Sequence, residues 1–252
     1  MKRQKNDYGY GYYKTKNFWG KYWEGGIVDY LRSHPKAGIF IEKHFGNRII
    51  KILEVGCGSA IDSVYLASKG YEVVALDYEE KTISRLKNCF AGIDNVTFVI
   101  GDAFNLGFKA KSFDLVFSNG LFIYYNDPDI AIMLKEQYRV AKHYIVFFVH
   151  NFENVFLVKL FRWKSRKNKL FEIRFFTKEE IIDVIKSSNI RYKEIKFMKM
   201  GGISDLIFKN IYKNLIFKNC KNLELKFNSV LLKTYRIQPW WLTERIGVVV
   251  RL

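Results

Sequence analysis

The feature that most constrains this chain is the stretch at residues 49–60, where an apolar run stops at two glycines one residue apart. The run at 49–55 is rich in β-branched residues, which predicts a buried parallel strand. Gly56 and Gly58 permit positive φ angles and let a ligand approach the main chain closely. The pattern at 61–69 then predicts a helix whose free N–H groups face the same space. The sequence therefore predicts a nucleotide-type site at this turn.

The amino-acid sequence of the turn narrows the class of ligand. A dinucleotide fingerprint would have a third glycine where this chain has Ile61. Glu-Val-Gly-Cys-Gly-Ser-Ala instead resembles the first motif of the class I S-adenosylmethionine-dependent methyltransferases. The resemblance implies that Gly56, Cys57 and Gly58 lie against the amino-acid part of the cofactor, and that Glu54 helps to order the turn. The alternative is a generic strand-to-helix turn in another α/β protein.

Two acidic residues follow later strands at informative spacings. Asp77 ends the second predicted strand, 21 residues after Gly56. A carboxylate there offers two acceptor oxygens to the vicinal ribose hydroxyls, and Tyr78 would pack against the adenine. In the resembling family an acid at the position of Asp102 faces the adenine amino group, with the N–H of Ala103 towards a ring nitrogen. For Asp102 alone, a turn or helix cap is the alternative.

The rest of the chain alternates strands with helices, which favours an α/β fold. Further strands are predicted at 72–76, 96–100, 113–117, 144–149, 192–200 and 246–252, with helices at 79–88, 128–140, 151–160 and after the capping box of Thr177 and Glu180. The resemblance implies a Rossmann-like methyltransferase fold: a mostly parallel seven-stranded sheet with an antiparallel last strand, plus a helical cap. We expect one domain over 1–252, with tail and cap helices at 1–48, a core at 49–200 and 245–252, and a cap insertion at 201–244.

Polar residues at the carboxyl ends of the fourth and fifth strands are candidates for the acceptor side. Ligands of open α/β sheets bind at this edge. Asn119 is expected next to the cofactor, and Tyr125 next to the substrate. His150 and Tyr124 are the candidate proton acceptors for a hydroxyl or amine. The alternative for His150 is a hydrogen-bonded loop histidine.

Aromatic residues near the N-terminus form a second candidate group. Trp19, Tyr22 and Trp23 lie within five residues of one another. In methyltransferases of this class the N-terminal helices commonly cover the cofactor and part of the substrate pocket, so these side chains are expected to bind substrate. The alternative is a hydrophobic patch that packs the N-terminal helices onto the sheet.

Positive charge is concentrated in the C-terminal part of the chain. The net charge is +17, of which residues 1–150 contribute +4 and residues 151–252 contribute +13. Within the insertion, Lys209, Lys213, Lys218 and Lys221 lie on the polar side of an amphipathic pattern. A helical cap is the first interpretation. Peripheral contact with an anionic membrane ranks second, and nucleic-acid contact ranks below it. A basic surface without a function is the remaining alternative.

Cysteine usage bears on the compartment. The chain has three cysteines, far apart and without metal-ligand spacing. This pattern favours a reduced, cytoplasmic environment and no metal site. The sequence shows no signal-peptide pattern and no apolar run of spanning length.

These observations predict methyl transfer from S-adenosylmethionine, with S-adenosylhomocysteine as product, to an oxygen or nitrogen of a small-molecule acceptor that is lipid-like or anionic. An RNA methyltransferase that uses the basic C-terminal region is one alternative. A catalytically silent nucleoside-binding protein is the other. The sequence does not indicate an oligomeric state.

Overall fold

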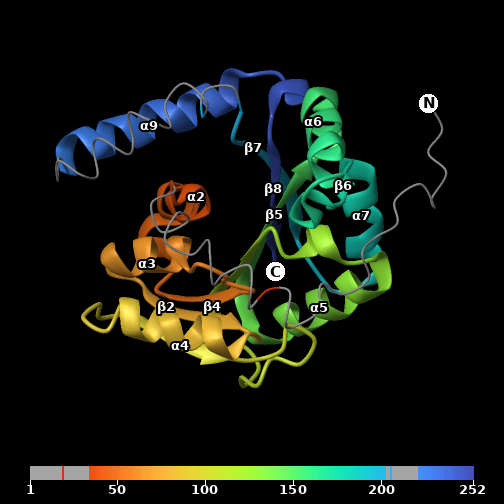
Figure 1. The fold of residues 1–252 in the computed structure, drawn as a ribbon. Helices are drawn as coiled ribbons and strands as arrows, with labels where there is room; N and C mark the ends of the chain where they lie inside the picture. The colour runs from red at the N-terminus through yellow and green to blue at the C-terminus, as the bar shows by residue number, and fades with distance from the viewer. Residues whose placement is uncertain (1–18, 20–33, 203–204, 206–220) are drawn as a thin grey trace.

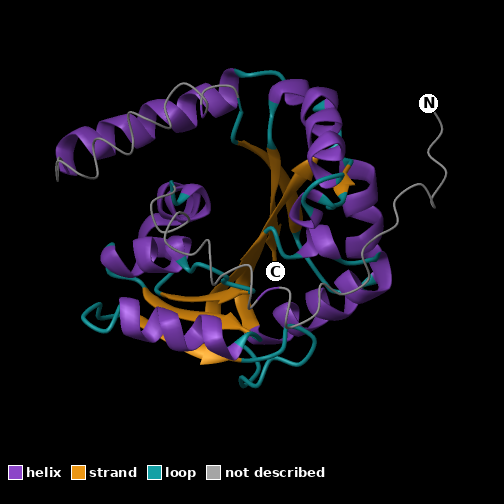
Figure 2. Cartoon of the chain, in the orientation of Figure 1, coloured by secondary structure: helices purple, strands orange, loops and turns teal. Residues whose placement is uncertain are grey.

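The computed structural model describes residue 19, residues 34–202, residue 205 and residues 221–252, with the backbone alone for 221–226. Its centre is an eight-stranded sheet (Figures 1 and 2). The strands are β1 (Lys51–Val55), β2 (Glu72–Asp77), β3 (Val96–Ile100), β4 (Phe113–Asn119), β5 (Ala141–Asn151), β6 (Phe175–Phe176), β7 (Glu194–Met200) and β8 (Arg245–Arg251).

The strand order confirms the predicted fold class. Along the sheet it is β3-β2-β1-β4-β5-β8-β7, with β6 paired to β5 off this path. The strands from β3 to β5 pair in parallel, whereas β8 is antiparallel to both β5 and β7. The chain reverses direction along the sheet between β1 and β4, which in open α/β sheets is where ligands bind. The sequence missed β6, because it is only two residues long and pairs only with the end of β5.

Helices cover both faces of the sheet (Figure 2). The α-helices are α2 (Lys36–Phe45), α3 (Ile61–Ser68), α4 (Glu80–Cys89), α5 (Asp127–Val140), α6 (Val155–Ser165), α7 (Lys178–Ser187) and α9 (Lys221–Ile237); short 3-10 turns are η1 (Gly46–Arg48), η2 (Phe122–Tyr124), η3 (Lys169–Phe171) and η4 (Trp240–Leu242). Helices α2, α3 and α9 share one buried cluster with the sheet, and α5 and α7 share another on the opposite face.

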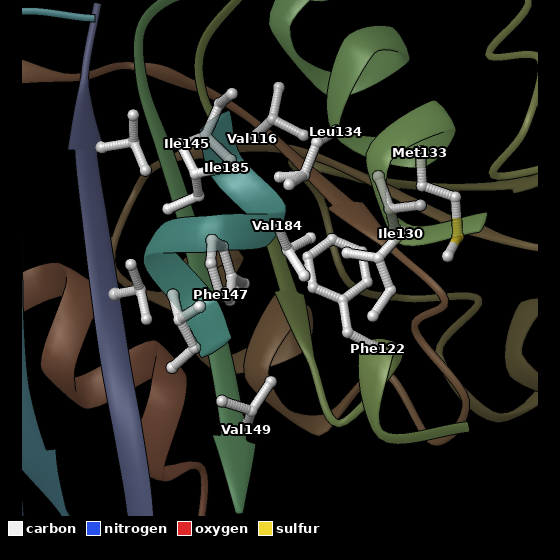
Figure 3. Close-up of a cluster of buried hydrophobic side chains, with 14 of the residues drawn as sticks. Val116, Phe122, Ile130, Met133, Leu134, Ile145, Phe147, Val149, Val184 and Ile185 are labelled. Atoms are coloured by element: carbon white, nitrogen blue, oxygen red, sulfur yellow. The ribbon is translucent and has the colours of Figure 1, made fainter. Parts of the chain in front are cut away.

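Alternation along β5 supplies both faces of the core. Ile145, Phe147 and Val149 belong to the cluster beneath α5 and α7, and Figure 3 shows Phe147 near Val184 and Ile145 near Ile185 of α7. Val146 and its neighbour on the same face, Phe148, pack instead with the residues of α2 and α3. A strand buried on both faces is expected in a sheet covered by helices on each side.

The boundary of α6 differs from the predicted 151–160. The strand β5 continues to Asn151, and the helix starts only at Val155. Asn154 is the N-cap, and its side-chain oxygen accepts a hydrogen bond from the Leu157 N–H at 3.0 Å. An asparagine cap satisfies a donor that the first helical turn leaves free. Three residues therefore separate the end of the strand from the start of the helix.

The C-terminal insertion is tied to the start of α2. Lys36 Nζ lies 2.6 Å from Asp205 Oδ2 and 2.8 Å from Glu244 Oε2. His34 Nε2 lies 3.1 Å from Asn228 Oδ1 on α9. The amphipathic stripe predicted around Lys209, Lys213 and Lys218 lies outside the described residues, as does the side chain of Lys221.

The close contact between α2 and α3 depends on Gly38. A Cβ at this position would lie 2.9 Å from the backbone oxygen of Asp62 and 3.0 Å from Tyr65 Cδ1. We therefore expect Gly38→Ala to lower the unfolding free energy by about 1–3 kcal/mol, the usual cost of overpacking. Chemical denaturation followed by circular dichroism measures this. Gly92→Ala is the control, because a Cβ there meets nothing within 4 Å. Equal stability of the two variants would show that α2 can shift freely.

Candidate active site

The glycine turn after β1 is folded tightly against the end of β2. Gly56 has φ +72° and Gly58 has φ +51°. The N–H groups of Gly56 and Cys57 both donate to the Leu76 carbonyl, at 2.8 and 2.9 Å. A Cβ on Gly56 would lie 2.9 Å from Leu121 Cδ1. The positive φ therefore favours glycine at position 56, and a Cβ there would displace the end of the Leu121 side chain.

Asp77 holds this turn from the end of β2. Its Oδ2 accepts the Gly58 N–H at 2.9 Å, and its Oδ1 accepts the Glu79 N–H at 3.1 Å. Burial raises the pKa of Asp77, while these hydrogen bonds act to lower it. A carboxylate oxygen can accept more than one hydrogen bond, so Asp77 can still accept hydrogen bonds from two hydroxyl groups.

Two other residues of the predicted cofactor set lie behind the turn. The carboxylate of Glu54 is buried and accepts a hydrogen bond from the Ser63 hydroxyl of α3. Burial raises its pKa well above the ordinary value, and the nearby Asp62 adds to this. The Cys57 side chain packs in an apolar cluster with Ala60 and Ile83. Neither side chain lines a cavity described below, so both are placed to support the turn from behind.

Two adjoining cavities lie at the carboxyl edge of the parallel strands, with volumes of about 780 and 270 Å³. They share the lining residues Gly56, Asp77, Tyr78, Leu121 and Tyr125. The structure thus brings together the glycine turn, the acid of β2 and the segment after β4. A long ligand with two chemically different ends could extend from one cavity into the other.

The larger cavity lies beyond the ends of β2 and β3. Asp102 and Ala103, two residues of the predicted cofactor set, line it together with Ile100, Phe104 and Ile132. Asp102 Oδ1 also accepts the Phe104 N–H at 2.9 Å. This contact is the kind expected from the alternative interpretation of Asp102 as a residue that caps a turn. Apolar walls with a few polar groups suit a flat base.

The smaller cavity has several aromatic side chains in its wall. Trp19 and Tyr124 line it and meet edge to face, with their ring centroids 5.0 Å apart. Phe161 of α6 and Phe171 of η3 also line it, with their ring centroids 5.1 Å apart. Two predicted substrate residues, Trp19 and Tyr125, therefore lie at this cavity. The other two, Tyr22 and Trp23, lie outside the described residues.

His150 lies in the wall of the smaller cavity, but its environment makes it a poor base. The side chain is buried, and its Nδ1 has no hydrogen-bond partner in the part of the chain that the structure describes. Burial lowers the pKa of His150 to about 3, and the cation of Arg245 acts in the same direction. The imidazole is therefore neutral near pH 7 and suited to hydrogen bonding. It holds a proton weakly, which counts against the predicted role as proton acceptor.

Arg245 is a site residue that the sequence reasoning missed. It is the cross-strand partner of His150, so both side chains leave the same face of the sheet. Its guanidinium donates to the side-chain oxygen of Asn119, whose amide nitrogen donates to Asp62 Oδ2 at 2.8 Å. Among the described residues that line the two cavities, it is the one cation. The signal that could have found it was the expected antiparallel last strand. Because such a strand runs against its parallel neighbours, its first residue lies at their carboxyl ends, where the site is.

Glu244 accompanies Arg245 in the smaller cavity. Burial alone would raise the pKa of Glu244, but the cations of Lys36 and Arg245 hold it well below the ordinary value. This carboxylate is therefore ionised and occupied by the 2.8 Å contact with Lys36. The start of α2, the end of β4 and the start of β8 meet here in one charged network.

S-adenosylmethionine fits these residues. The glycine turn leaves open backbone for an amino-acid group, and Asp77 stands where ribose hydroxyls need acceptors. The apolar cavity beyond Tyr78 suits the adenine. Asp77 is buried and lines both cavities, and its carboxylate favours the positive charges of the ammonium and sulfonium groups.

Comparisons with known proteins agree with this geometry. A family model described as "Methyltransferase domain" matches residues 52–143. Phosphoethanolamine N-methyltransferase 3 of Arabidopsis thaliana is 29% identical over 138 residues, which are 50% of this chain and 28% of that protein. Demethylmenaquinone methyltransferase of Staphylococcus epidermidis is 40% identical over 96 residues, which are 36% of this chain and 39% of that protein. The chain thus spans well under half the length of both curated relatives.

Solved structures share the fold across nearly the whole chain. A SAM-dependent methyltransferase from Thermotoga maritima superposes with a TM-score of 0.59 at 16% identity, covering 94% of this chain and 97% of that one. Another from Archaeoglobus fulgidus gives 0.58 at 14% identity, covering 92% and 99%. At these identities the likeness concerns the fold, and it includes the regions outside residues 52–143.

The first prediction from this site concerns Asp77. Asp77→Ala removes an acceptor for ribose hydroxyls and a support of the glycine turn. We expect affinity for S-adenosylhomocysteine to fall by about 1.5–3 kcal/mol, the range for hydrogen bonds to charged groups. Isothermal titration calorimetry measures it, with the exposed Asp94→Ala as control. Unchanged affinity, or tighter binding of NAD by the wild type, would contradict the assignment of this cavity.

The second prediction uses the depressed pKa of His150. Its folded pKa of about 3 lies below the ordinary 6.5, so the unfolded chain binds more protons as the pH falls below 6.5. Its share of stability is therefore fully present above pH 6.5 and is lost on acidification, by about 2 kcal/mol at pH 5. Buried carboxylates titrate both in the wild type and in a variant without His150, so the difference between the two proteins isolates the contribution of the histidine to the pH dependence. We expect His150→Leu to show a smaller fall in unfolding free energy between pH 7 and 5. Identical falls would mean that His150 is not buried as neutral imidazole.

Proposed function

Because this chain carries a methyltransferase domain of the class I S-adenosylmethionine-dependent superfamily, we propose that the protein methylates an oxygen or nitrogen of a small-molecule acceptor. The observation that carries the proposal is the pair of cavities that meet at Gly56, Asp77 and Tyr125. One cavity suits the nucleoside, and the other leaves aromatic space for an acceptor beside the same turn. Such an arrangement supports transfer between two ligands held end to end.

Positioning is the main contribution that we assign to the protein. The cofactor, when bound, supplies an activated methyl group on a sulfonium, so the reaction needs an aligned lone pair. Trp19, Tyr124 and Phe161 are placed to orient a ring or chain in the smaller cavity and to exclude water from it. Buried and with a pKa near 3, His150 is better suited to accept a hydrogen bond from the acceptor than to remove its proton.

The charge at this end of the cavity bears on the acceptor class. Arg245 stands beside His150 with its Nε 3.4 Å from Glu244 Oε1, and Lys36 Nζ contacts the other oxygen of that carboxylate at 2.8 Å. A guanidinium binds oxyanions well and lowers the pKa of a neighbouring acidic hydroxyl. We therefore propose that the acceptor places an anionic or acidic group at Arg245. This group need not be the atom that is methylated.

The names of the curated relatives support a small acceptor over RNA. One is a phosphoethanolamine N-methyltransferase and the other a demethylmenaquinone methyltransferase. The cavity walls near His150 are also largely aromatic, which suits a compact apolar ligand. The RNA and silent-protein alternatives remain as outcomes of the test below.

The test follows radioactive methyl from S-adenosylmethionine into a cell extract that contains both metabolites and RNA. We expect label in the small-molecule fraction, extractable into organic solvent or retained by an anion exchanger. Asp77→Ala should reduce the label roughly 10-fold or more at limiting cofactor, from its loss of affinity. Label in RNA would favour the RNA methyltransferase. Binding of S-adenosylhomocysteine without label in either fraction would favour the silent protein.

A further inference from the structure

The outward side of α6 carries an unusual combination of side chains. Its inward positions, Leu157, Val158 and Phe161, follow a helical period and are buried or half-buried. The exposed positions recur at the complementary spacing and comprise Val155, Phe156, Lys159, Arg162, Trp163 and Arg166. We call these six residues the α6 outer face. Apolar and basic side chains are interspersed along it.

The apolar members of the α6 outer face are strongly exposed. The exposed fraction is 77% for Phe156, 58% for Trp163 and 57% for Val155. The outward side of a surface helix is normally polar, and contiguous exposed apolar groups usually mark a binding surface. Trp241 is also exposed, and its turn is joined to the start of α6 by hydrogen bonds from Asn151 to Trp240 O and from Asn154 to Thr243 O.

The charge of this region has one sign. Residues 154–171 contain six lysines and arginines and no acidic residue. The acid just before them, Glu153, lies 3.6 Å from Lys178 Nζ. Lys167 Nζ lies 6.0 Å from the centroid of the Trp163 ring, so the basic and aromatic groups are adjacent in space. A partner of this surface must accept apolar rings and bring negative charge.

We propose that the α6 outer face docks the protein on the surface of an anionic lipid bilayer. An amphipathic helix with aromatic residues and lysine or arginine on its exposed side lies in the plane of the interface. Phosphate groups take the basic side chains, while Phe156 and Trp163 enter the boundary between headgroups and acyl chains. Contact would be peripheral: none of the helices in the described part of the chain has the length and apolarity to span a membrane.

Other occupants fit this face less well. An isologous dimer would bring the same basic stretch of two copies together, and like charges repel. A nucleic acid would neutralise the charges but leave Val155 and Phe156 facing water or phosphate. An anionic bilayer can bind both the basic side chains, through its phosphate groups, and the exposed apolar side chains, through its acyl chains. It also matches the position of α6 in Figure 1, at the periphery of the molecule and away from α4.

Docking on this face would place the smaller cavity next to the bilayer. Phe161 lies on the inward side of the same helix and lines that cavity with Leu170, Phe171 and Ile173. If the proposed function holds, an acceptor with a lipid-like body and an anionic head could then pass from the bilayer to Arg245. The docking itself does not depend on methyl transfer and is tested separately.

The experiment is flotation of the full chain with vesicles of phosphatidylcholine and phosphatidylglycerol, and with vesicles of phosphatidylcholine alone. We expect binding to the mixed vesicles only. Phe156→Ser/Trp163→Ser should weaken partition about tenfold or more, from the apolar area withdrawn. Lys159→Glu/Arg166→Glu should weaken it at least 30-fold, since each basic residue near an anionic surface contributes roughly fivefold.

Matched controls lie elsewhere on the surface. Ile50→Ser removes an isoleucine that is 62% exposed just before β1, and Lys87→Glu/Lys109→Glu reverses two exposed charges. Both should float as the wild type does, and circular dichroism checks the fold of every variant. Absence of binding to mixed vesicles would overturn the proposal, as would equal losses in the controls. RNA retention that only the charge reversals abolish, or a dimer that only Phe156→Ser/Trp163→Ser dissociates, would assign the face to those partners instead.

Discussion

The arrangement of the site depends on one buried carboxylate, that of Asp62 in the first turn of α3. It accepts the Gly38 N–H of α2 and the side-chain amide of Asn119, each at 2.8 Å. Asn119 in turn accepts from Arg245 at the start of β8. Four elements distant in sequence are thereby joined at the carboxyl edge of the sheet. A buried carboxylate without these donors would be strongly unfavourable, so the network and the packing of α2 support each other.

The local electrostatics of the site differ from those of the whole chain. The protein carries a net charge of +17, yet Glu54, Asp62 and Asp77 are all buried around the glycine turn. Burial raises the pKa of each of them, so keeping these acids ionised is costly without a nearby cation. A cofactor with ammonium and sulfonium groups would supply positive charge there. Arg245 instead provides positive charge in the wall of the smaller cavity.

Helix α6 connects the interior of the site with the surface of the protein. Its inward side contributes Phe161 to the cavity, and its outer face presents Phe156 and Trp163 to solvent. The sequence had suggested a basic surface in the insertion at 201–244, where three of the six lysines lie outside the described residues. The structure gives the stronger argument for α6, because there exposure, charge and proximity to the cavity can be compared on one element.

The sequence by itself determined the features that depend on near neighbours. The glycine turn, the spacing to Asp77 and the capping box of Thr177 with Glu180 could be predicted, because each is decided within a few residues or one βα unit. Only the tertiary structure placed Arg245 beside His150, since that contact depends on the register of two strands about ninety-five residues apart in the chain. It also decided the pKa of His150, because burial and a neighbouring cation lower it and neither can be read from local sequence.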